Sequence, residues 1–468
     1  MRKTKIVVTV GPASRDPETV RKLIPLVDVF RINFSHGDRQ SHIEEIRTIR
    51  RESKGLGKTV AILQDLPGPK IRVGKIAGDA VELKQGSKIV LDASSEEGTA
   101  LRVPVNFPAL LGSVTRGDVL HLADGVIKLR VEDASKESVT CTVLAGAVLG
   151  SGKGINAPGA KFKIDYPTKS DVSHLRFGLT HGVDFVAASF VRTPSDLQAM
   201  RRLIPKEGPM LVAKVEKSEA VKNFDSILAE ADAVMVARGD LGIEVPIENV
   251  PAIQRRITSK CREAGKPVIV ATQMLVSMVS SPVPSRAEVT DVSNAILEES
   301  DAVMLSDETT VGKYPVDATR MLDKIARTTE KYLPAYDQRP LRSGGGETGP
   351  AIARAACGLA TYVGAKAIVA PTQTGATARR VSMNRPREPI IAICADKRVS
   401  RRLNLYWGVV SVVSRQAMTV DWLFQRADAV AEELGLAKKG DKIVVTSGTP
   451  GVRGTTNHIK VSVVGRKD

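Results

Sequence analysis

Eight short runs rich in β-branched and other apolar residues recur along the first two-thirds of the chain, with helical patterns between them. They span residues 5–10, 27–32, 60–63, 183–187, 210–215, 233–236, 268–271 and 302–305. Strands that alternate with amphipathic helices pair in parallel through right-handed crossovers. Eight such units favour a closed (β/α)₈ barrel over an open doubly wound sheet. The predicted fold class is therefore α/β, with a TIM barrel.

One interval breaks this alternation. About 120 residues separate the third run from the fourth, far more than one strand-to-helix connection needs. Residues 73–152 alternate apolar and polar side chains between Gly-Asp and Asp-Gly turns, a pattern typical of β-hairpins. We predict an all-β lid domain inserted after strand 3, which leaves residues 1–72 and 153–335 for the catalytic barrel.

A Pro/Gly-rich linker at residues 334–349 leads into a third domain, residues 345–468. Helix and strand patterns alternate there, which predicts an open α/β domain. The chain carries a formal charge of +16, from 68 basic and 52 acidic residues. Residues 340–468 hold 20 basic and 9 acidic residues, so +11 of this charge lies at the carboxy-terminal end. Such an excess suits a negatively charged partner.

Several classes of protein are excluded by the sequence. No apolar run approaches the roughly 18 residues that cross a bilayer, and the first residues lack the apolar core of a secretory signal. We therefore expect a cytoplasmic protein with no membrane partner. The four cysteines lie far apart without metal-ligand spacing, so we expect reduced thiols and no zinc site. Any metal would then be held by carboxylates.

Polar residues directly follow seven of the eight predicted strands, at the end where (β/α)₈ barrels carry their active sites. They are Arg31, Asn33, Ser35, His36, Asp65, Arg72, Ser189, Arg192, Lys214, Glu216, Arg238, Gly239, Asp240, Thr272, Gln273, Ser306 and Glu308. Each residue alone could be a solvated loop position or half of an ion pair. Seven strands in succession indicate a functional site.

Within this ring, Glu216 and Asp240 are the carboxylates best suited to a hard divalent cation, although each could also be an ion-pair partner. Lys214 precedes Glu216 by two residues, so both side chains point to the same face of a strand. A lysine beside a metal can stabilise negative charge on a bound oxyanion. The small residues of the 238–242 segment let backbone amides approach an anion, or else simply cap a helix.

Five strings carry a resemblance to the pyruvate kinase family, and they occur in the family's order. They are Arg31-Ile-Asn-Phe-Ser-His-Gly37, Ala213-Lys-Val-Glu216, Met235-Val-Ala-Arg-Gly-Asp-Leu-Gly-Ile-Glu244, Lys266-Pro-Val-Ile-Val-Ala-Thr-Gln-Met274 and Met304-Leu-Ser306. The likeness runs from Lys5 to about Val464. It implies a barrel with an inserted β lid and a regulatory carboxy-terminal domain, assembled as a homotetramer. The implied reaction moves the phosphoryl group of phosphoenolpyruvate to ADP, which yields ATP and pyruvate.

The resemblance also implies roles for the residues at the strand ends. Lys214 would stabilise the transferring phosphoryl group and the enolate oxygen, while Glu216 and Asp240 would bind Mg²⁺ or Mn²⁺. The amides of Gly239 and Asp240, with the Thr272 hydroxyl, would hold the substrate carboxylate, and Thr272 would lie near the route of the proton. Arg31 would contact phosphate. The implied nucleotide-binding residues are Asn33, Ser35, His36, Arg72 and Lys153.

Lys70 departs from the family pattern, because most members carry a glutamate at that position. Those members bind K⁺ through residues that match Asn33, Ser35 and Asp65 and the backbone carbonyl of Leu66. An ammonium at position 70 adds its own positive charge and removes a negative one. We therefore expect an enzyme that needs Mg²⁺ or Mn²⁺ but not K⁺; the alternative is that Lys70 extends into solvent. Val276 and Asp307 also depart from the pattern, with no consequence that the sequence explains.

A turn rich in hydroxyls connects a strand to a helix in the third domain. Its residues Thr372, Thr374, Gly375 and Thr377 resemble the family's effector-phosphate loop, and the loop at residues 447–451 could complete the site. Free amides and hydroxyls at a helix start suit an anion, which predicts a phosphorylated effector. The alternative is that the loop is only a tight helix cap.

Two other functions compete with this interpretation. A metal-dependent (β/α)₈ lyase or aldolase could also use carboxylates at the strand ends, but it would not explain the lid or the third domain. A nucleic-acid-binding protein is suggested by the eight basic residues between Arg379 and Arg402. Aromatic residues make up only 4% of the chain, and no base-stacking or groove-reading motif is present in the sequence, so we expect no nucleic-acid partner.

Overall fold

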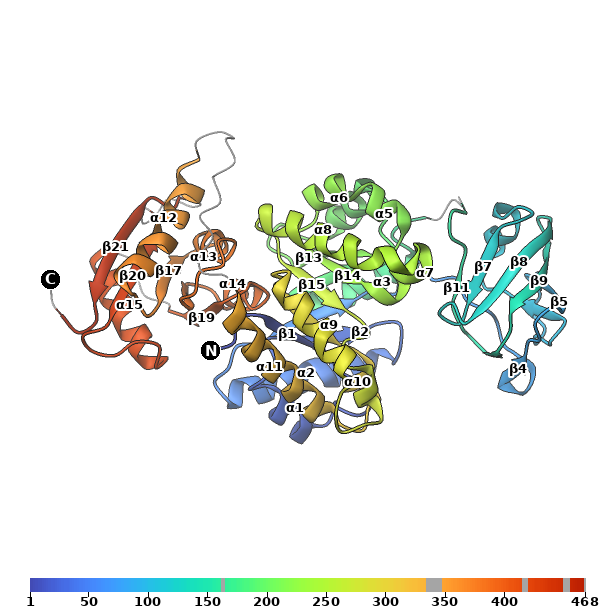
Figure 1. Ribbon diagram of the computed structural model, residues 1–468, viewed down its shortest axis with the longest axis horizontal. Helices are drawn as coiled ribbons and strands as arrows, with labels where there is room; N and C mark the ends of the chain where they lie inside the picture. The colour runs from blue at the N-terminus through green and yellow to red at the C-terminus, as the bar shows by residue number, and fades with distance from the viewer. Residues whose placement is uncertain (161–164, 334–346, 415–419, 449–454, 467–468) are drawn as a thin grey trace.

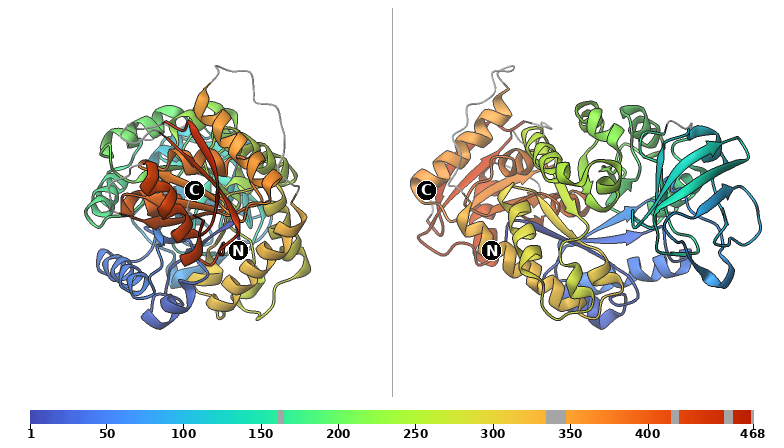
Figure 2. Two further views of the ribbon diagram at one scale, coloured as in Figure 1. Left: turned by 90° about the vertical axis from the view of Figure 1, so that its left-hand side faces the viewer. Right: turned by 45° about the vertical axis from the view of Figure 1, so that its right-hand side comes forward.

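The computed structural model describes residues 1–160, 165–333, 347–414, 420–448 and 455–466. A closed barrel lies between an all-β domain at one end and a five-stranded sheet at the other (Figure 1). The right view of Figure 2 shows the same linear order of the three parts, and the left view looks along it with the carboxy-terminal domain in front. Most of the predicted linker and part of the 447–451 loop lie outside the described residues.

The barrel is built from eight parallel strands in the order β1-β16-β15-β14-β13-β12-β3-β2. Their bounds are β1 Lys5–Thr9, β2 Val29–Asn33, β3 Ala61–Asp65, β12 Phe185–Ala188, β13 Met210–Val215, β14 Ala233–Ala237, β15 Val268–Ala271 and β16 Ala302–Leu305. Inward-facing side chains such as Leu63, Phe185 and Met235 fill its interior, so the barrel is a packed core. All eight strands predicted from the β-branched runs are confirmed.

Helices follow the strands and form the outer layer of the barrel. Their bounds are α1 Pro17–Leu23, α2 Arg39–Gly55, α3 Lys169–Thr180, α4 Pro194–Leu203, α5 Ser218–Lys222, α6 Phe224–Glu230, α7 Arg238–Glu244, α8 Val250–Glu263, α9 Arg286–Leu297, α10 Asp307–Thr310 and α11 Pro315–Thr329, with 3₁₀ turns η3 Ile247–Asn249, η4 Val276–Val279 and η5 Glu330–Tyr332. Several begin at a side-chain cap. The Asp38 carboxylate, for example, accepts from the Ser41 amide at 2.8 Å, which satisfies a free donor at the start of α2.

The segment after β3 forms the inserted β lid. A six-stranded sheet has the order β11-β7-β8-β9-β5-β6, and β10 pairs with β4 beside it. The bounds are η1 Ala77–Asp79, β4 Ala80–Glu82, β5 Lys88–Asp92, β6 Arg102–Pro104, η2 Pro108–Ser113, β7 Val119–Leu122, β8 Ile127–Ala134, β9 Ser138–Ala145, β10 Val148–Gly150 and β11 Ile155–Asn156. Alternate residues of β8, such as Leu129 and Val131, are buried in a separate core. The predicted lid is confirmed.

The carboxy-terminal domain has a mixed sheet with the order β19-β18-β17-β20-β21. Its elements are α12 Thr348–Val363, β17 Ile368–Thr372, α13 Ala376–Ser382, β18 Ile390–Cys394, α14 Lys397–Leu403, β19 Val409–Val413, α15 Val420–Glu433, β20 Lys442–Ser447 and β21 His458–Val463. Ile368 packs on one face of the sheet with Ala356 of α12, and Val369 packs on the other with Val430 of α15. Helices therefore cover both faces, as an open α/β domain requires.

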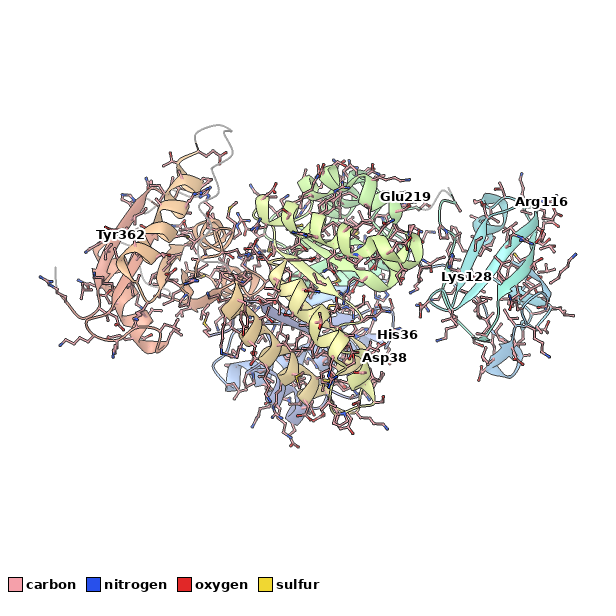
Figure 3. The ribbon with its side chains drawn as sticks, viewed as in Figure 1. His36, Asp38, Arg116, Lys128, Glu219 and Tyr362 are labelled. Atoms are coloured by element: carbon pink, nitrogen blue, oxygen red, sulfur yellow. The ribbon has the colours of Figure 1, made fainter. Side chains whose placement is uncertain are left out.

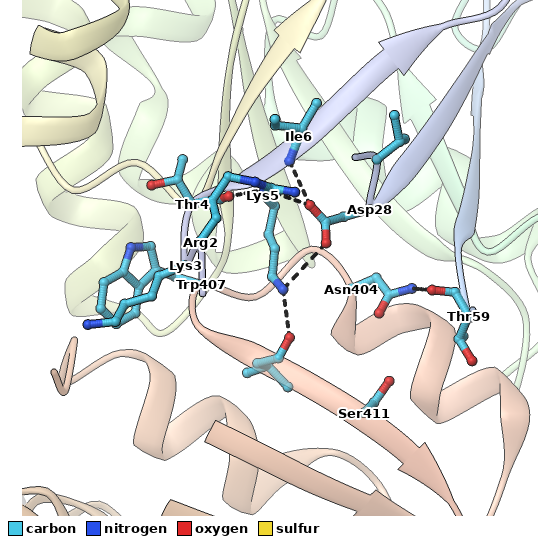
Figure 4. A network of polar contacts seen from close by, with 12 residues as sticks. Arg2, Lys3, Thr4, Lys5, Ile6, Asp28, Thr59, Asn404, Trp407 and Ser411 are labelled. Carbon is cyan, nitrogen blue, oxygen red and sulfur yellow. Dashed lines mark hydrogen bonds and ion pairs between the residues drawn. The ribbon is translucent and has the colours of Figure 1, made fainter. Parts of the chain in front are cut away.

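A network of buried charges joins this domain to the barrel (Figure 4). The Lys5 ammonium donates to the Val409 carbonyl at 2.6 Å and lies 3.6 Å from the Asp28 carboxylate. Arg2 pairs with Asp28 at 2.8 Å, and Asn404 donates to the Thr59 carbonyl at 2.8 Å. Lys5 and Thr59 lie at the amino ends of β1 and β3, so the carboxy-terminal domain is attached to the end of the barrel opposite the lid.

Two expectations of the sequence concern the chain as a whole. Among the described residues, no helix combines the length and the apolar character that crossing a membrane requires. The four cysteines are buried and form no disulfide: Cys141, Cys261, Cys357 and Cys394.

Candidate active site

A buried lysine forms the centre of the polar cluster at the carboxyl ends of the barrel strands. The Lys214 ammonium lies 2.7 Å from the Ser189 hydroxyl, 3.1 Å from Asp65 and 2.8 Å from Glu216. Burial alone would lower the pKa of Lys214, but the two carboxylates outweigh it and raise that pKa above its ordinary value. The side chain therefore stays protonated at neutral pH and presents a fixed positive charge.

Asp65 is the shared counter-ion of this cluster. Arg31 donates to its second oxygen at 2.7 Å, and Arg31 also donates to the Thr9 hydroxyl at 2.9 Å. Burial would raise the pKa of Asp65, but Lys214 and Arg31 hold it below its ordinary value. From the sequence, Asp65 is expected only at a monovalent-ion site. The structure adds a second role, because this one carboxylate holds both Arg31 and Lys214 at the carboxyl end of the barrel.

Glu216, which contacts Lys214, has a second carboxylate, Asp240, nearby. Burial raises the pKa of Glu216, Lys214 opposes the rise, and the nearby charge of Asp240 adds to it. The two carboxylates are therefore close enough to repel one another. Among the described residues, no group of three or more His, Cys, Asp or Glu side chains is gathered as a metal site. This pair fits a hard divalent cation that completes its shell with water and substrate oxygens.

Thr272 and Gln273 lie in a strained turn directly after β15. Their φ angles are 70° and 56°, in the left-handed region that a β-branched residue such as threonine rarely adopts. The Thr272 hydroxyl donates to the Ala271 carbonyl at 2.5 Å and accepts from the Gly239 amide at 2.9 Å. Strain of this kind gathers at active sites, where the surrounding structure enforces it.

Arg238 is what holds this turn. Its guanidinium donates to the Thr272 carbonyl at 2.7 Å and to the Gln273 carbonyl at 3.2 Å, and it pairs with Asp291 at 2.7 Å. The sequence placed Arg238 in the ring of polar residues but gave it no role. Only the fold brings the two carbonyls of the β15 end within reach of a residue that follows β14.

The family model for the pyruvate kinase barrel domain matches residues 1–319 of the chain, and the model for the pyruvate kinase alpha/beta domain matches residues 350–462. This chain belongs to the pyruvate kinase family. It is therefore a phosphotransferase, and family membership decides against the lyase or aldolase alternative.

Similar proteins support the assignment along the whole chain. A pyruvate kinase of Geobacillus stearothermophilus is 44% identical over 475 residues, which cover 99% of this chain and 80% of that protein. A pyruvate kinase of Thermococcus litoralis is 43% identical over 462 residues, with coverage of 96% and 95%. The crystal structure of a pyruvate kinase from Cryptosporidium parvum superposes with a TM-score of 0.90 at 35% identity and covers 99% of this chain and 96% of that one.

Lys70, one of the residues at which this chain departs from the family pattern, points toward the site. Its ammonium lies 3.7 Å from the Asp240 carboxylate, and its side chain is only 27% exposed. A Cβ on Gly154 would approach the Lys70 side chain to 3.1 Å, so the glycine leaves room for the lysine. Lys70 therefore lies between the outgoing and returning connections of the lid, beside a carboxylate, and does not extend into solvent.

Oxygen atoms expected at the monovalent-ion site already have hydrogen-bond or ion-pair partners within the chain. The Asn33 side-chain oxygen accepts from the Ser35 amide at 3.2 Å. The Leu66 carbonyl accepts from the Ser189 hydroxyl at 2.7 Å. With Asp65 bound by two cationic side chains, these oxygens lie in surroundings that already carry positive charge.

The expected nucleotide-binding residues lie on the barrel edge and on the two connections to the lid. Arg72 pairs across the connections with Gly154 and donates to the Gly152 carbonyl at 2.9 Å, next to the exposed Lys153. His36 lies at the barrel edge that faces the lid (Figure 3). Partial burial lowers the pKa of His36, and the charges of Arg72 and Lys70 lower it further. A cavity of about 270 Å³, lined by Lys70 among others, opens beside these connections.

The threonine side chains of the predicted effector loop differ in their exposure to solvent. The buried Thr372 hydroxyl accepts from the Gly375 amide at 2.9 Å, and the buried Thr377 hydroxyl lies 3.0 Å from that of Thr456. Gly375 has a φ of 86°, which favours glycine at this position. Thr374, in contrast, is exposed. Two of the three threonines are therefore engaged in holding the loop itself.

Proposed function

We propose that this chain transfers the phosphoryl group of phosphoenolpyruvate to ADP at the carboxyl ends of its barrel strands, giving ATP and pyruvate. The observation that carries the proposal is the Lys214 ammonium, which two carboxylates keep charged at the centre of the cluster. Phosphoryl transfer depends mainly on positioning and on stabilising negative charge. A coupled assay for ADP-dependent formation of pyruvate tests the activity directly.

The substrate would be held by residues from four strands. Arg31 would contact the phosphoryl group, and Lys214 would stabilise its charge and that of the enolate oxygen. The amides of Gly239 and Asp240 would bind the carboxylate, with the Thr272 hydroxyl beside them and near the route of the proton. Because the Gly239 amide donates to Thr272 at 2.9 Å, the substrate carboxylate would replace Thr272 as its acceptor. The Thr272 hydroxyl would then be free to interact with the substrate.

Glu216 and Asp240 would hold Mg²⁺ or Mn²⁺. A divalent cation supplies neutralisation of the negative charge that develops on the phosphoryl oxygens. We expect Glu216→Gln and Asp240→Asn each to raise the Mg²⁺ concentration for half-maximal activity about tenfold or more. Glu248→Gln, an exposed carboxylate just beyond α7, is the matched control. Unchanged Mg²⁺ activation in both site variants would exclude this pair as the metal ligands.

The nucleotide would bind through Asn33, Ser35, His36, Arg72 and Lys153. Arg72 and Lys153 belong to the two lid connections, so ADP phosphates bound there would draw the lid toward the barrel. Closing the lid would exclude water from the reacting phosphoryl group.

The enzyme would be independent of K⁺, because the Lys70 ammonium supplies a fixed cation in place of the ion. The support is its 3.7 Å approach to Asp240 beside an Asp65 that two cations already neutralise. In a buffer free of Na⁺ and K⁺, we expect added KCl to change wild-type turnover less than about twofold. Lys70→Glu should lower turnover and make it respond to KCl, since the variant restores a carboxylate that favours a bound cation.

Lys75→Glu is the matched control for this experiment. Lys75 lies five residues further into the lid connection, with 71% of its side chain exposed. It should leave the K⁺ response of the wild type unchanged. A large gain in wild-type rate on adding KCl would show that the ammonium does not replace the ion.

The remaining proposals concern organisation and regulation. We assign residues 1–72 and 153–335 to the barrel, 73–152 to the lid and 345–468 to a regulatory domain, in a cytoplasmic homotetramer whose mass light scattering can check. An anionic phosphorylated effector would bind the loop of Thr372, Thr374, Gly375 and Thr377. Titrating phosphorylated metabolites against a Thr372→Ala/Thr377→Ala variant tests that location, and unchanged activation would reject it.

A further inference from the structure

A cavity of about 500 Å³ lies where the barrel meets the carboxy-terminal domain, on the side of the barrel opposite the catalytic cluster. The barrel lines it with the connection between α4 and β13, including Lys206 and Met210. The carboxy-terminal domain lines it with side chains near α13 and α14, including Arg379, Arg402 and Tyr406. A ligand in this cavity would contact both domains at once.

The lining of this cavity is strongly basic. Four cationic side chains and one carboxylate give it a formal charge of +3: Arg201, Lys206, Arg379, Arg402 and Asp232. The single carboxylate is already committed, because Asp232 accepts from Arg201 at 2.7 Å and from the Leu211 amide at 2.8 Å. Asp232 therefore offsets only Arg201, and the net charge of +3 comes from the other three cations.

Among the residues that the structure describes, the other three cations form no salt bridge. Arg402 donates to backbone carbonyls, that of Glu207 at 2.7 Å and that of Gly208, which carry no charge. Within the part of the chain that the structure describes, Lys206 and Arg379 form no salt bridge. Cations crowded around a cavity repel one another, so an anion that enters it is stabilised by all three.

Tyr406 adds a second donor group to the same wall. The residue is 3% exposed, and its hydroxyl lies beside the Arg379 guanidinium. Burial raises the pKa of this phenol, and the charge of Arg379 and a hydrogen bond with it oppose the rise. Because no described residue meets strict hydrogen-bond geometry with the Tyr406 oxygen, the hydroxyl can still turn toward an anion in the cavity.

We propose that this cavity binds a small phosphorylated metabolite. Its volume is in the range of small-molecule sites, and each of its guanidiniums can bind a phosphate through two parallel hydrogen bonds. A phosphate with two negative charges also matches the net charge of the lining better than a carboxylate with one. The site is separate from the proposed effector loop, from which only Thr374 reaches the cavity. It is also separate from the proposed catalytic function, because binding here needs neither ADP nor phosphoenolpyruvate.

The cavity borders the element that carries the catalytic lysine. Met210, in its lining, is the first residue of β13, and Lys214 lies four residues further along the same strand. At about 3.3 Å per residue, Met210 and Lys214 are roughly 13 Å apart along the strand. A bound phosphate would tie α13 and α14 to the start of that strand.

Isothermal titration of the full-length protein with inorganic phosphate and with glycerol 3-phosphate tests the proposal. The variant Lys206→Gln/Arg379→Gln removes two cations that hold no salt bridge, so its unfolding temperature should stay close to that of the wild type. Losing two charged hydrogen-bond donors should weaken binding of glycerol 3-phosphate about tenfold or more. The matched control Lys366→Gln/Lys397→Gln removes the same charge from exposed positions outside the cavity and should bind like the wild type.

Three results would overturn the proposal. The first is the absence of wild-type binding at millimolar glycerol 3-phosphate. The second is equal affinity in wild type and Lys206→Gln/Arg379→Gln, which would place the bound phosphate elsewhere, for example in the active site. The third is malonate binding as tightly as glycerol 3-phosphate, which would show that the cavity selects dianions in general and not a phosphoryl group.

Discussion

Replacing Arg238 by methionine should slow this enzyme without removing any group that touches the substrate. The guanidinium makes three hydrogen bonds to the carbonyls of Thr272 and Gln273, at 2.7, 3.2 and 3.2 Å. A hydrogen bond from a charged donor contributes about 1.5–3 kcal/mol, and each left-handed residue costs about 1–3 kcal/mol. The free energy that the hydrogen bonds contribute is similar to the free energy that the left-handed residues cost. The turn should therefore relax once the hydrogen bonds are lost.

Relaxation of this turn would move the Thr272 hydroxyl away from the bound substrate. Because a displacement of about 1 Å at a reacting group can cost about 10²-fold in rate, we expect kcat to fall about a hundredfold in Arg238→Met. The KM for ADP should stay within about twofold of wild type, since the proposed nucleotide residues lie on other strands. Steady-state kinetics with each substrate varied in turn measures both effects. Arg238→Lys should recover part of kcat, because an ammonium can still donate to one carbonyl.

Asp291→Asn provides the matched control. It weakens the ion pair that Arg238 makes at 2.7 Å but leaves the donors to both carbonyls in place. We expect its kcat within about threefold of wild type, in keeping with the small value of a partly exposed ion pair. The reasoning is refuted if Arg238→Met keeps wild-type kcat, or if Asp291→Asn loses as much activity as Arg238→Met.

Two further predictions concern the buried charges and thiols. Asp28→Asn should lower stability at pH 7 by about 3–5 kcal/mol, because it leaves Lys5 without its buried counter-ion and Arg2 with Asp323 alone. Burial would raise the pKa of Asp28, but Arg2 and Lys5 hold it below its ordinary value. This stabilisation is complete above the ordinary carboxyl pKa and is lost as the pH falls through the lower folded-state pKa. The gap between wild-type and variant unfolding temperatures should therefore narrow below about pH 4, and a gap that widens would contradict the network. Burial raises the pKa of Cys141 and of Cys394 to about 12, so a thiol reagent at pH 7.5 should label almost none of the four cysteines until guanidinium unfolds the chain. Fast labelling of the folded protein would contradict the burial.

Local pattern was enough to predict the architecture. Strands such as β13 and β15 are short apolar runs buried on both faces, and a buried strand of a parallel sheet has that composition whatever its neighbours are. The lid was predictable for the opposite reason, because β8 alternates buried and exposed residues. The strand β19 leaves a weaker signal in the sequence, because it is only partly buried at the edge of its sheet.

The residues of the candidate site could be predicted from the sequence, but the contacts between them could not. Strand ends point to one rim of a barrel, so Lys214, Glu216 and Asp240 could be expected together. Which carboxylate serves which cation depends on distances between strands that lie far apart in sequence. The pairing of Asp65 with both Arg31 and Lys214 is of this kind. The hydrogen bonds that Arg238 donates to backbone carbonyls leave no signal in the sequence, because every residue has a carbonyl.

Lys70 belongs to the segment that leads out of the barrel into the lid, so its ammonium moves with that connection. A dissolved cation fills a site to an extent set by its concentration in the surrounding medium. A cation on a tether has a local concentration that the medium does not change. Under the proposed replacement of K⁺ by Lys70, the charge at this rim of the barrel would be set by the position of the lid and not by the ions of the medium. Such an enzyme would keep its activity when the salt concentration of the medium changes, and its electrostatics would follow the opening and closing of its own lid.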